Sequence, residues 1–239
     1  MISREIKKIQ QRLANEKLRN IRAVILYGSW VKGTAREDSD VDLLAIYRRR
    51  DKKTSATVNE LVNNIDMDRD FTVVHALQND FIKEKWPVYT AAKAEGRVIF
   101  GDIDLSRCDT PPPTRYSEFF KTSRDFESRK VELAEKFLKG GLTSGVIDHC
   151  FIASKHAVQA ALAMRGKGFS SKMNVLLPLA KECFGTETAQ KLRKLYELYK
   201  RSEAIFTDIT KKDAKLAVRY AKDVLKVYDP CPAACNLKS

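Results

Sequence analysis

Two short stretches of this chain carry residues suited to phosphate and metal chemistry. Gly28 and Ser29 follow an alternating apolar run, residues 21–27, and a glycine lets a phosphate approach the backbone closely because it has no Cβ. Asp40 and Asp42 stand two positions apart where a second apolar run begins. Residues i and i+2 of a strand point to the same face, so we expect both carboxylates to converge on one spot.

This pattern predicts a metal–nucleotide site. Ser29 adds a hydroxyl donor at the expected start of a helical turn, where free backbone N–H groups favour anions. Magnesium prefers a few carboxylate oxygens together with phosphate oxygens. Glycine turns and Asp-x-Asp pairs also occur separately, as caps and solvated turns. Their order between two strand-like runs, 21–27 and 41–47, favours the site.

The order of these residues is similar to that of a known family. Gly28 and Ser29, ten further residues and then Asp40-x-Asp42 resemble the minimal nucleotidyltransferases of the polymerase-β-type superfamily. The resemblance implies that Gly28 and Ser29 bind the nucleotide through its triphosphate. It also implies that Asp40 and Asp42 are catalytic and hold Mg²⁺, in a two-metal site, against the α-phosphate.

The same resemblance implies a third metal-binding carboxylate at the head of a later strand. Asp70 precedes the apolar run 71–76 and matches that position. We therefore expect Asp70 to complete the acceptor-side metal site and to be catalytic. Asp66 and Asp68 lie close enough in the sequence to compete for this role.

The resemblance implies an enzyme that moves a nucleoside monophosphate from a Mg²⁺-bound nucleoside triphosphate, ATP foremost, to an acceptor hydroxyl with release of pyrophosphate. The acceptor is a small molecule, a protein side chain or RNA. The alternative is a non-catalytic module, a nucleotide-sensing or RNA-binding adaptor, and its signature would be the lack of a third carboxylate.

The apolar periodicity predicts the elements that position these residues. Pro87 is expected to bend the last helix of the first half, and residues 111–113, three consecutive prolines, are expected to form an extended linker without regular hydrogen-bonded structure. The predicted elements of the first half are an amphipathic helix 2–19, strands 21–27, 41–47, 71–76 and 98–100, and helices 55–64 and 79–95.

The second half shows helical stripes throughout, which predicts an up-and-down bundle. The fold class is therefore α+β, a mixed sheet with flanking helices followed by a helical bundle. The domain boundaries that we predict are 1–104 for the nucleotidyltransferase domain, 105–114 for the proline-rich linker, 115–230 for the bundle and 231–239 for a tail.

The bundle resembles the HEPN domains that are often paired with minimal nucleotidyltransferases. The segments that carry this resemblance are 161–166 and 199–206. Members of that family that cleave RNA have an arginine four to six residues before a helical histidine. Neither His149 nor His156 has one at that distance, so we do not expect ribonuclease activity. The residues favour one histidine between helices and the other on a helix surface.

The charge and the cysteines indicate partners and compartment. The chain carries a net charge of +13, and the part after Cys108 is the more basic. Such a field attracts nucleoside triphosphates and RNA, although a basic helix face is also a common solvated surface. The odd number of cysteines, including Cys231 and Cys235 in the tail, favours reduced thiols. We expect a cytoplasmic protein without membrane contact, with a homodimer as one arrangement.

Overall fold

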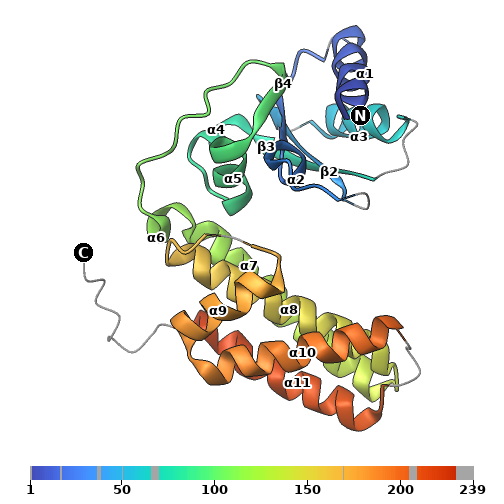
Figure 1. Cartoon of the computed structure of the whole chain (residues 1–239), viewed down its shortest axis with the longest axis vertical. Coiled ribbons are helices and arrows are strands. Elements are labelled where there is room, and N and C mark those ends of the chain that lie inside the picture. The colour runs from blue at the N-terminus through green and yellow to red at the C-terminus, as the bar shows by residue number, and fades with distance from the viewer. Residues whose placement is uncertain are drawn as a thin grey trace. The chain divides into compact units, whose positions relative to one another are not determined.

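The computed structural model of the chain shows two compact units, Met1–Pro111 and Pro112–Ser239 (Figure 1). Each unit has a hydrophobic core of its own. The structure describes residues 2–16, 18–36, 39–49, 51–65, 70–168, 170–204 and 209–229.

The first unit contains a four-stranded sheet of order β3-β2-β1-β4 among the described residues. Strand β2 pairs antiparallel with β1 and parallel with β3, and β4 pairs antiparallel with β1. The predicted mixed sheet is therefore confirmed. Its strands are β1 (Ile21–Tyr27), β2 (Val41–Tyr47), β3 (Phe71–Leu77) and β4 (Arg97–Gly101).

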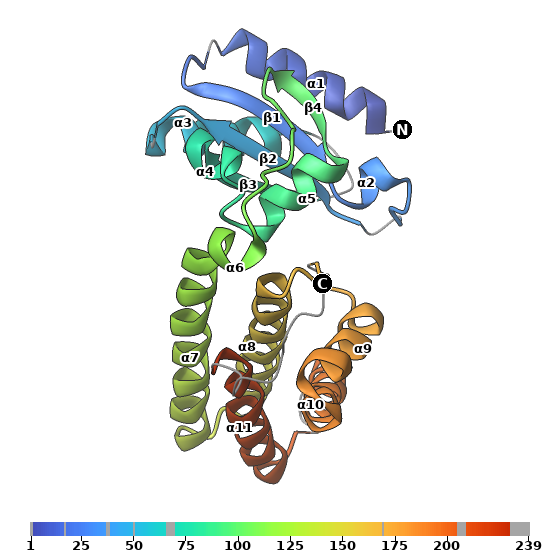
Figure 2. The same ribbon diagram turned by 90° about the vertical axis from the view of Figure 1, so that its left-hand side faces the viewer.

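Helices cover both faces of this sheet (Figure 2). One core joins α1 and α3 to one face, and a second core joins α4 and α5 to the other. Strands β1 and β2 lie in the middle of the sheet, and their apolar side chains are buried on both faces. The alternation expected for residues 21–27 is therefore wrong, because a central strand covered on both faces carries a continuous apolar run. The helices of this unit are α1 (Ile2–Asn15), α2 (Ser29–Lys32), α3 (Lys52–Asn63), α4 (Gln78–Ile82) and α5 (Pro87–Glu95).

Some predicted helix boundaries are wrong, and proline explains two of them. Pro87 does not bend one helix but begins α5, after α4 has ended at Ile82. Pro112 likewise begins a short helix, α6 (Pro112–Arg115), where we expected no regular structure. Proline lacks an N–H and fits the first turn of a helix, where that N–H has no partner to lose. Helix α1 ends at Asn15, earlier than predicted.

The second unit is a helical bundle built around α8. This helix buries a run of small residues, among them Cys150, Ala153, Ala157 and Ala161, and small side chains let neighbouring helices approach closely. The helical prediction for this half is confirmed, while the resemblance to HEPN domains stays a prediction. The helices are α7 (Ser117–Lys139), α8 (Thr143–Met164), α9 (Met173–Phe184), α10 (Thr186–Ala204) and α11 (Lys211–Leu225).

Two further predictions concern the thiols and the membrane. Cys108, Cys150 and Cys183 are free cysteines, and Cys231 and Cys235 lie outside the described residues. Among the helices that the structure describes, none is long and apolar enough to cross a membrane.

Candidate active site

The site residues predicted from the sequence lie at one end of the sheet, where β1 ends and where β2 and β3 begin. Tyr27 pairs with Asp42 across β1 and β2, and Val41 pairs with Phe71 across β2 and β3. The backbone N–H of Val41 donates to the carbonyl of Asp70 at 2.9 Å. The sheet therefore brings together the backbone positions of Gly28, Ser29, Asp40, Asp42 and Asp70.

The glycine turn packs directly against one of the carboxylates. Gly28 has φ 79° and ψ −150°, a combination that residues with a Cβ rarely adopt. A Cβ at this position would lie 2.5 Å from Oδ2 of Asp42 and 3.3 Å from its Cγ. Glycine is thus required both for the turn and for the close approach, which places the Asp42 carboxylate against the backbone just before Ser29.

Trp30 holds the loop between the turn and the carboxylates, a role that the sequence analysis missed. Its indole Nε1–H donates to the carbonyls of Ser39 at 3.2 Å and of Asp40 at 3.0 Å. Gly33 ends α2 with φ 69°, and its N–H donates to the carbonyl of Ser29. The signal in the sequence was a tryptophan directly after Ser29, because a partly buried indole N–H needs an acceptor.

The two neighbouring carboxylates repel each other. Asp42 is half-buried and Asp40 is exposed. Burial, and then the charge of Asp40, raises the pKa of Asp42 above its usual range. Burial, followed by the charge of Asp42, also raises the pKa of the Tyr27 hydroxyl. Neither carboxylate has a hydrogen bond or an ion pair with another side chain in the part of the chain that the structure describes.

The carboxylates of Asp40 and Asp42 fit a magnesium ion that is also bound by a substrate phosphate. Two adjacent carboxylates without a cationic partner are hard oxygen donors, and Mg²⁺ is typically held by one or two carboxylates together with substrate phosphates. Within the described ranges, no group of three or more His, Cys, Asp or Glu side chains is placed to hold a metal. The pair Asp40 and Asp42 supplies two carboxylates of the kind that hold Mg²⁺ together with substrate phosphates.

The strand register places the third carboxylate, Asp70, on the same face of the sheet as Asp40 and Asp42. Val41 pairs with Phe71 and Asp42 with Thr72, and residues alternate between faces along a strand. The structure thus brings Asp70 to the same end of the sheet without gathering its carboxylate into a cluster with the other two. Its rivals, Asp66 and Asp68, lie outside the described residues, so its role as the third ligand stays a prediction.

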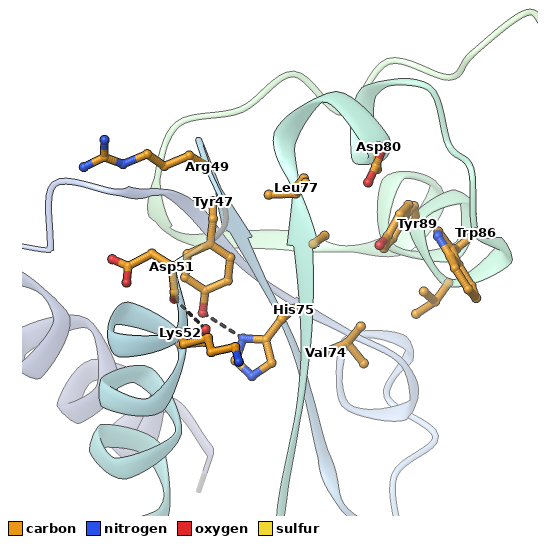
Figure 3. A pocket seen from close by; sticks show the side chains of 13 residues that line it. Tyr47, Arg49, Asp51, Lys52, Val74, His75, Leu77, Asp80, Trp86 and Tyr89 are labelled. Atoms are coloured by element: carbon orange, nitrogen blue, oxygen red, sulfur yellow. Dashed lines mark hydrogen bonds between the residues drawn. The ribbon is translucent and has the colours of Figure 1, made fainter.

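The opposite end of the same strands holds a saturated hydrogen-bond chain. Nδ1 of His75 lies 2.8 Å from the Tyr47 hydroxyl, and Nε2 lies 3.0 Å from Oδ1 of Asn59 in α3. Burial lowers the pKa of His75, which matches a neutral ring that accepts from the tyrosine and donates to the asparagine. Figure 3 shows the contact with Tyr47. Both ring nitrogens are used, so His75 is a structural residue.

The histidines of the helical unit also have local partners. Nδ1 of His149 lies 2.9 Å from the carbonyl of Gly145, and its ring packs edge-on against Phe137 of α7. Nδ1 of His156 lies 3.1 Å from Oε1 of the buried Glu127. These contacts put His149 between helices and leave the partly exposed His156 at the surface of α8, as predicted.

Comparison with known families finds a similarity that is confined to the first unit. The family model described as polymerase beta, nucleotidyltransferase, matches residues 7–104. The first unit is therefore similar to the polymerase beta nucleotidyltransferases over residues 7–104, and the matched segment includes all the predicted site residues. No curated protein matches the chain.

One solved structure shares its fold with this chain over both units. The spectinomycin adenyltransferase AAD(9) from Enterococcus faecialis, whose crystal structure contains ATP and spectinomycin, is similar with a TM-score of 0.55 and 13% sequence identity. The match covers 94% of this chain and 99% of that chain. A nucleotidyltransferase-like protein from Exiguobacterium sibiricum also matches, with a TM-score of 0.40 and 13% identity over 92% of this chain and 74% of that chain.

Proposed function

We propose that this protein is a nucleotidyltransferase that moves a nucleoside monophosphate, AMP from ATP foremost, to an acceptor hydroxyl with release of pyrophosphate. The observation that carries the proposal is the contact between Gly28 and Asp42. Because Gly28 has no Cβ, the turn that would bind the phosphates and a carboxylate that would bind the metal share one spot. The polymerase beta match over residues 7–104 supports the same chemistry.

Magnesium, when bound, would neutralise charge on the triphosphate and on the departing pyrophosphate. Asp40 and Asp42 would hold it, since they are adjacent carboxylates without a cationic partner among the described residues. Their repulsion, which raises the pKa of Asp42, is relieved by a cation. Asp70 is the residue that we propose for the acceptor side, where a carboxylate favours loss of the hydroxyl proton.

The turn itself would bind the outer phosphates of the nucleotide. On the side that no Cβ fills, the backbone of Gly28 lies against the Asp42 carboxylate, so phosphates on a metal held by Asp42 would lie beside the turn. The Ser29 hydroxyl supplies a donor next to it. Trp30 fixes the loop that follows through the carbonyls of Ser39 and Asp40. This anchoring keeps the turn and the carboxylates in register, and positioning supplies much of the rate in phosphoryl transfer.

A small hydroxylated compound is the acceptor that we propose to test first. The solved structure with ATP and spectinomycin resembles this chain over both units, although at 13% identity that likeness concerns the fold. The excess of basic residues after Cys108 keeps RNA as a second acceptor, because a positive field attracts polyanions.

Label transfer tests the proposal. The purified protein is incubated with Mg²⁺ and with each nucleoside triphosphate in turn, labelled at the α-phosphate. The acceptors offered are an aminocyclitol such as spectinomycin, RNA and cell protein. We expect covalent label on one acceptor class together with an equal amount of pyrophosphate. Triphosphate binding that depends on Mg²⁺ but gives no covalent transfer would contradict the proposal and favour the nucleotide-sensing adaptor.

A further inference from the structure

Helix α11 differs from its neighbours in the charge of its exposed face. It packs on α8 between α7 and α10 (Figure 2), and its buried residues are alanines and valines that belong to the core of the bundle. Every exposed residue of α11 is a lysine or an arginine. These residues are Lys211, Lys212, Lys215, Arg219 and Lys222, and Lys226 in the turn after the helix is exposed as well.

The basic side chains form one row along the helix, which we call the α11 basic row. Lys211, Lys215, Arg219, Lys222 and Lys226 follow one another at intervals of three or four residues, and residues at these intervals lie on one face of a helix. Four residues advance about 6 Å along a helix, so the row from Lys211 to Lys226 is about 22 Å long. The result is a straight line of evenly spaced positive charges.

The acidic residues of α11 itself are directed to α10 and are already paired. Asp213 lies 2.6 Å from the guanidinium of Arg201, and Asp223 lies 2.6 Å from Nζ of Lys191. Asp223 also pairs with Lys226 at 2.8 Å, at the far end of the row. These carboxylates therefore leave the first turns of the row without compensation.

The neighbouring helix α7 supplies one further acidic partner. Glu135 pairs with Lys222 at 2.7 Å. The earlier members of the row, from Lys211 to Arg219, have no acidic partner among the residues that the structure describes. The positive charge is thus concentrated in the first half of α11.

This arrangement reduces the stability of the helix. Like charges four residues apart repel each other, and Lys211 stands in the first turn, where the helix dipole disfavours a cation. A surface that serves only solubility mixes both signs, and the exposed faces of α7 and α10 do so. Their exposed acids are Glu118, Asp125 and Glu132 in α7 and Glu187, Glu197 and Glu203 in α10. A partner of negative charge would relieve the repulsion along α11.

We propose that the α11 basic row binds the phosphate backbone of single-stranded RNA. Such a strand is a polyanion with regularly repeated charges, and it is flexible enough to follow a straight row, whereas a duplex backbone turns away. The contacts go to phosphates, so binding does not depend on base sequence. The proposal concerns binding and holds whether or not the first unit transfers nucleotides.

Two other kinds of partner fit this face less well. No apolar side chain of α11 is exposed, whereas a protein interface has an apolar centre and a membrane-bound helix inserts an apolar face. The unpaired positive charge is also confined to one helix, because α7 and α10 carry both signs. A narrow row suits a strand better than a flat anionic surface.

Fluorescence anisotropy with a labelled oligouridine of about 12 nucleotides tests the proposal. The variant carries Lys211→Gln, Lys215→Gln and Arg219→Gln together. We expect its dissociation constant to be at least about ten-fold higher than that of wild type. The slope of log Kd against log salt concentration should fall by about 2, because each phosphate contact to a single strand contributes about 0.7.

A triple variant on α7 is the matched control. It carries Lys121→Gln, Arg129→Gln and Lys136→Gln, which are exposed and have no acidic partner in the described part of the chain. It removes the same residue types and the same net charge, and its dissociation constant should stay within about two-fold of wild type. Glutamine is a good helix former, so circular dichroism should show both variants folded. The α11 variant should melt at or above the wild-type temperature, because repulsion is lost.

Three results would overturn the proposal. The first is a wild-type protein that does not bind the oligouridine at low salt. The second is an equal loss of binding in the two triple variants, because net charge and not the row would then be responsible. The third is binding to vesicles that contain phosphatidylserine, lost in the α11 variant, without binding to RNA, because the partner would then be a membrane surface.

Discussion

The polar side chains at the two ends of strands β2 and β3 differ in whether they have hydrogen-bond partners. At the end with His75, the ring is hydrogen-bonded to Tyr47 and Asn59, and Asp51 caps α3 by accepting from the backbone N–H of Lys53. At the end with Gly28, Asp40 and Asp42 repel each other and have no hydrogen-bonded or cationic partner among the described residues.

This difference separates a structural cluster of polar residues from the candidate active site. Satisfied polar groups stabilise the fold, whereas two carboxylates left beside each other reduce its stability. A fold retains such repulsion when a ligand relieves it, which is why strongly shifted pKa values gather at functional sites. We therefore expect substitutions at the acidic end to affect activity, and substitutions at the other end to affect stability.

The largest effect is expected for Asp42→Asn. Transfer should fall by at least about a thousand-fold, because a metal ligand and its charge are lost. The metal-free variant should be as stable as wild type or more so. Since the pKa of Asp42 is raised in the folded state, its ionisation opposes folding, and the advantage of the variant should grow as pH rises through that pKa and vanish at low pH. Steady-state kinetics and thermal melts at several pH values check both outcomes.

Asp70→Asn tests the third carboxylate. We expect a loss of transfer as large as that of Asp42→Asn, because the acceptor side would lose its metal ligand. Circular dichroism establishes that the fold is kept, and the same transfer assay measures the loss. A fully active variant would move the third ligand to Asp66 or Asp68, or to no residue at all.

Gly28→Ala should have an intermediate effect on transfer. The Cβ would meet Oδ2 of Asp42 at 2.5 Å in a backbone conformation that favours glycine, so we expect about 1–3 kcal/mol of lost stability and a displaced carboxylate. Gly33→Ala is the matched control, because Gly33 also has a positive φ but no atom within 4 Å of its added Cβ. Equal activity losses in the two variants would mean that backbone strain, not the Asp42 contact, is responsible.

The smallest effect on transfer is expected for Tyr47→Phe. The variant removes the hydroxyl that lies 2.8 Å from Nδ1 of His75, and a lost hydrogen bond of this kind costs about 1 kcal/mol of unfolding free energy. Denaturant titration should show that loss, while kcat/KM stays within about two-fold of wild type. A large loss of kcat/KM would give the His75 end a part in catalysis.

The sequence predicted the strands and the candidate site because both depend on local pattern. The apolar runs of β1 and β2 are continuous, and the spacing from Ser29 to Asp40 sets the order of turn and strand. The contact between Gly28 and Asp42 was not predictable, because it depends on the antiparallel pairing of Tyr27 with Asp42. Nor was the role of Trp30, whose acceptors lie nine and ten residues away in the sequence.

Predictions that depended on proline were the weakest. Pro87 and Pro112 were expected to disturb or exclude helices, but each begins one. The residue itself permits both outcomes, and the deciding factor is whether the following residues continue as a helix. The partners of His75 were also beyond the sequence, since Asn59 reaches it from α3 only after the helix has packed on the sheet.

We propose that the acidic end of the sheet performs nucleotidyl transfer, while the other end supports the fold. The decisive experiment measures pyrophosphate release from ATP in the presence of Mg²⁺ and the acceptor found by label transfer. Wild type, Asp40→Asn and Tyr47→Phe are measured side by side. We expect wild type and Tyr47→Phe to release pyrophosphate at similar rates, and Asp40→Asn to release none above background. Release by Asp40→Asn at the wild-type rate would contradict it.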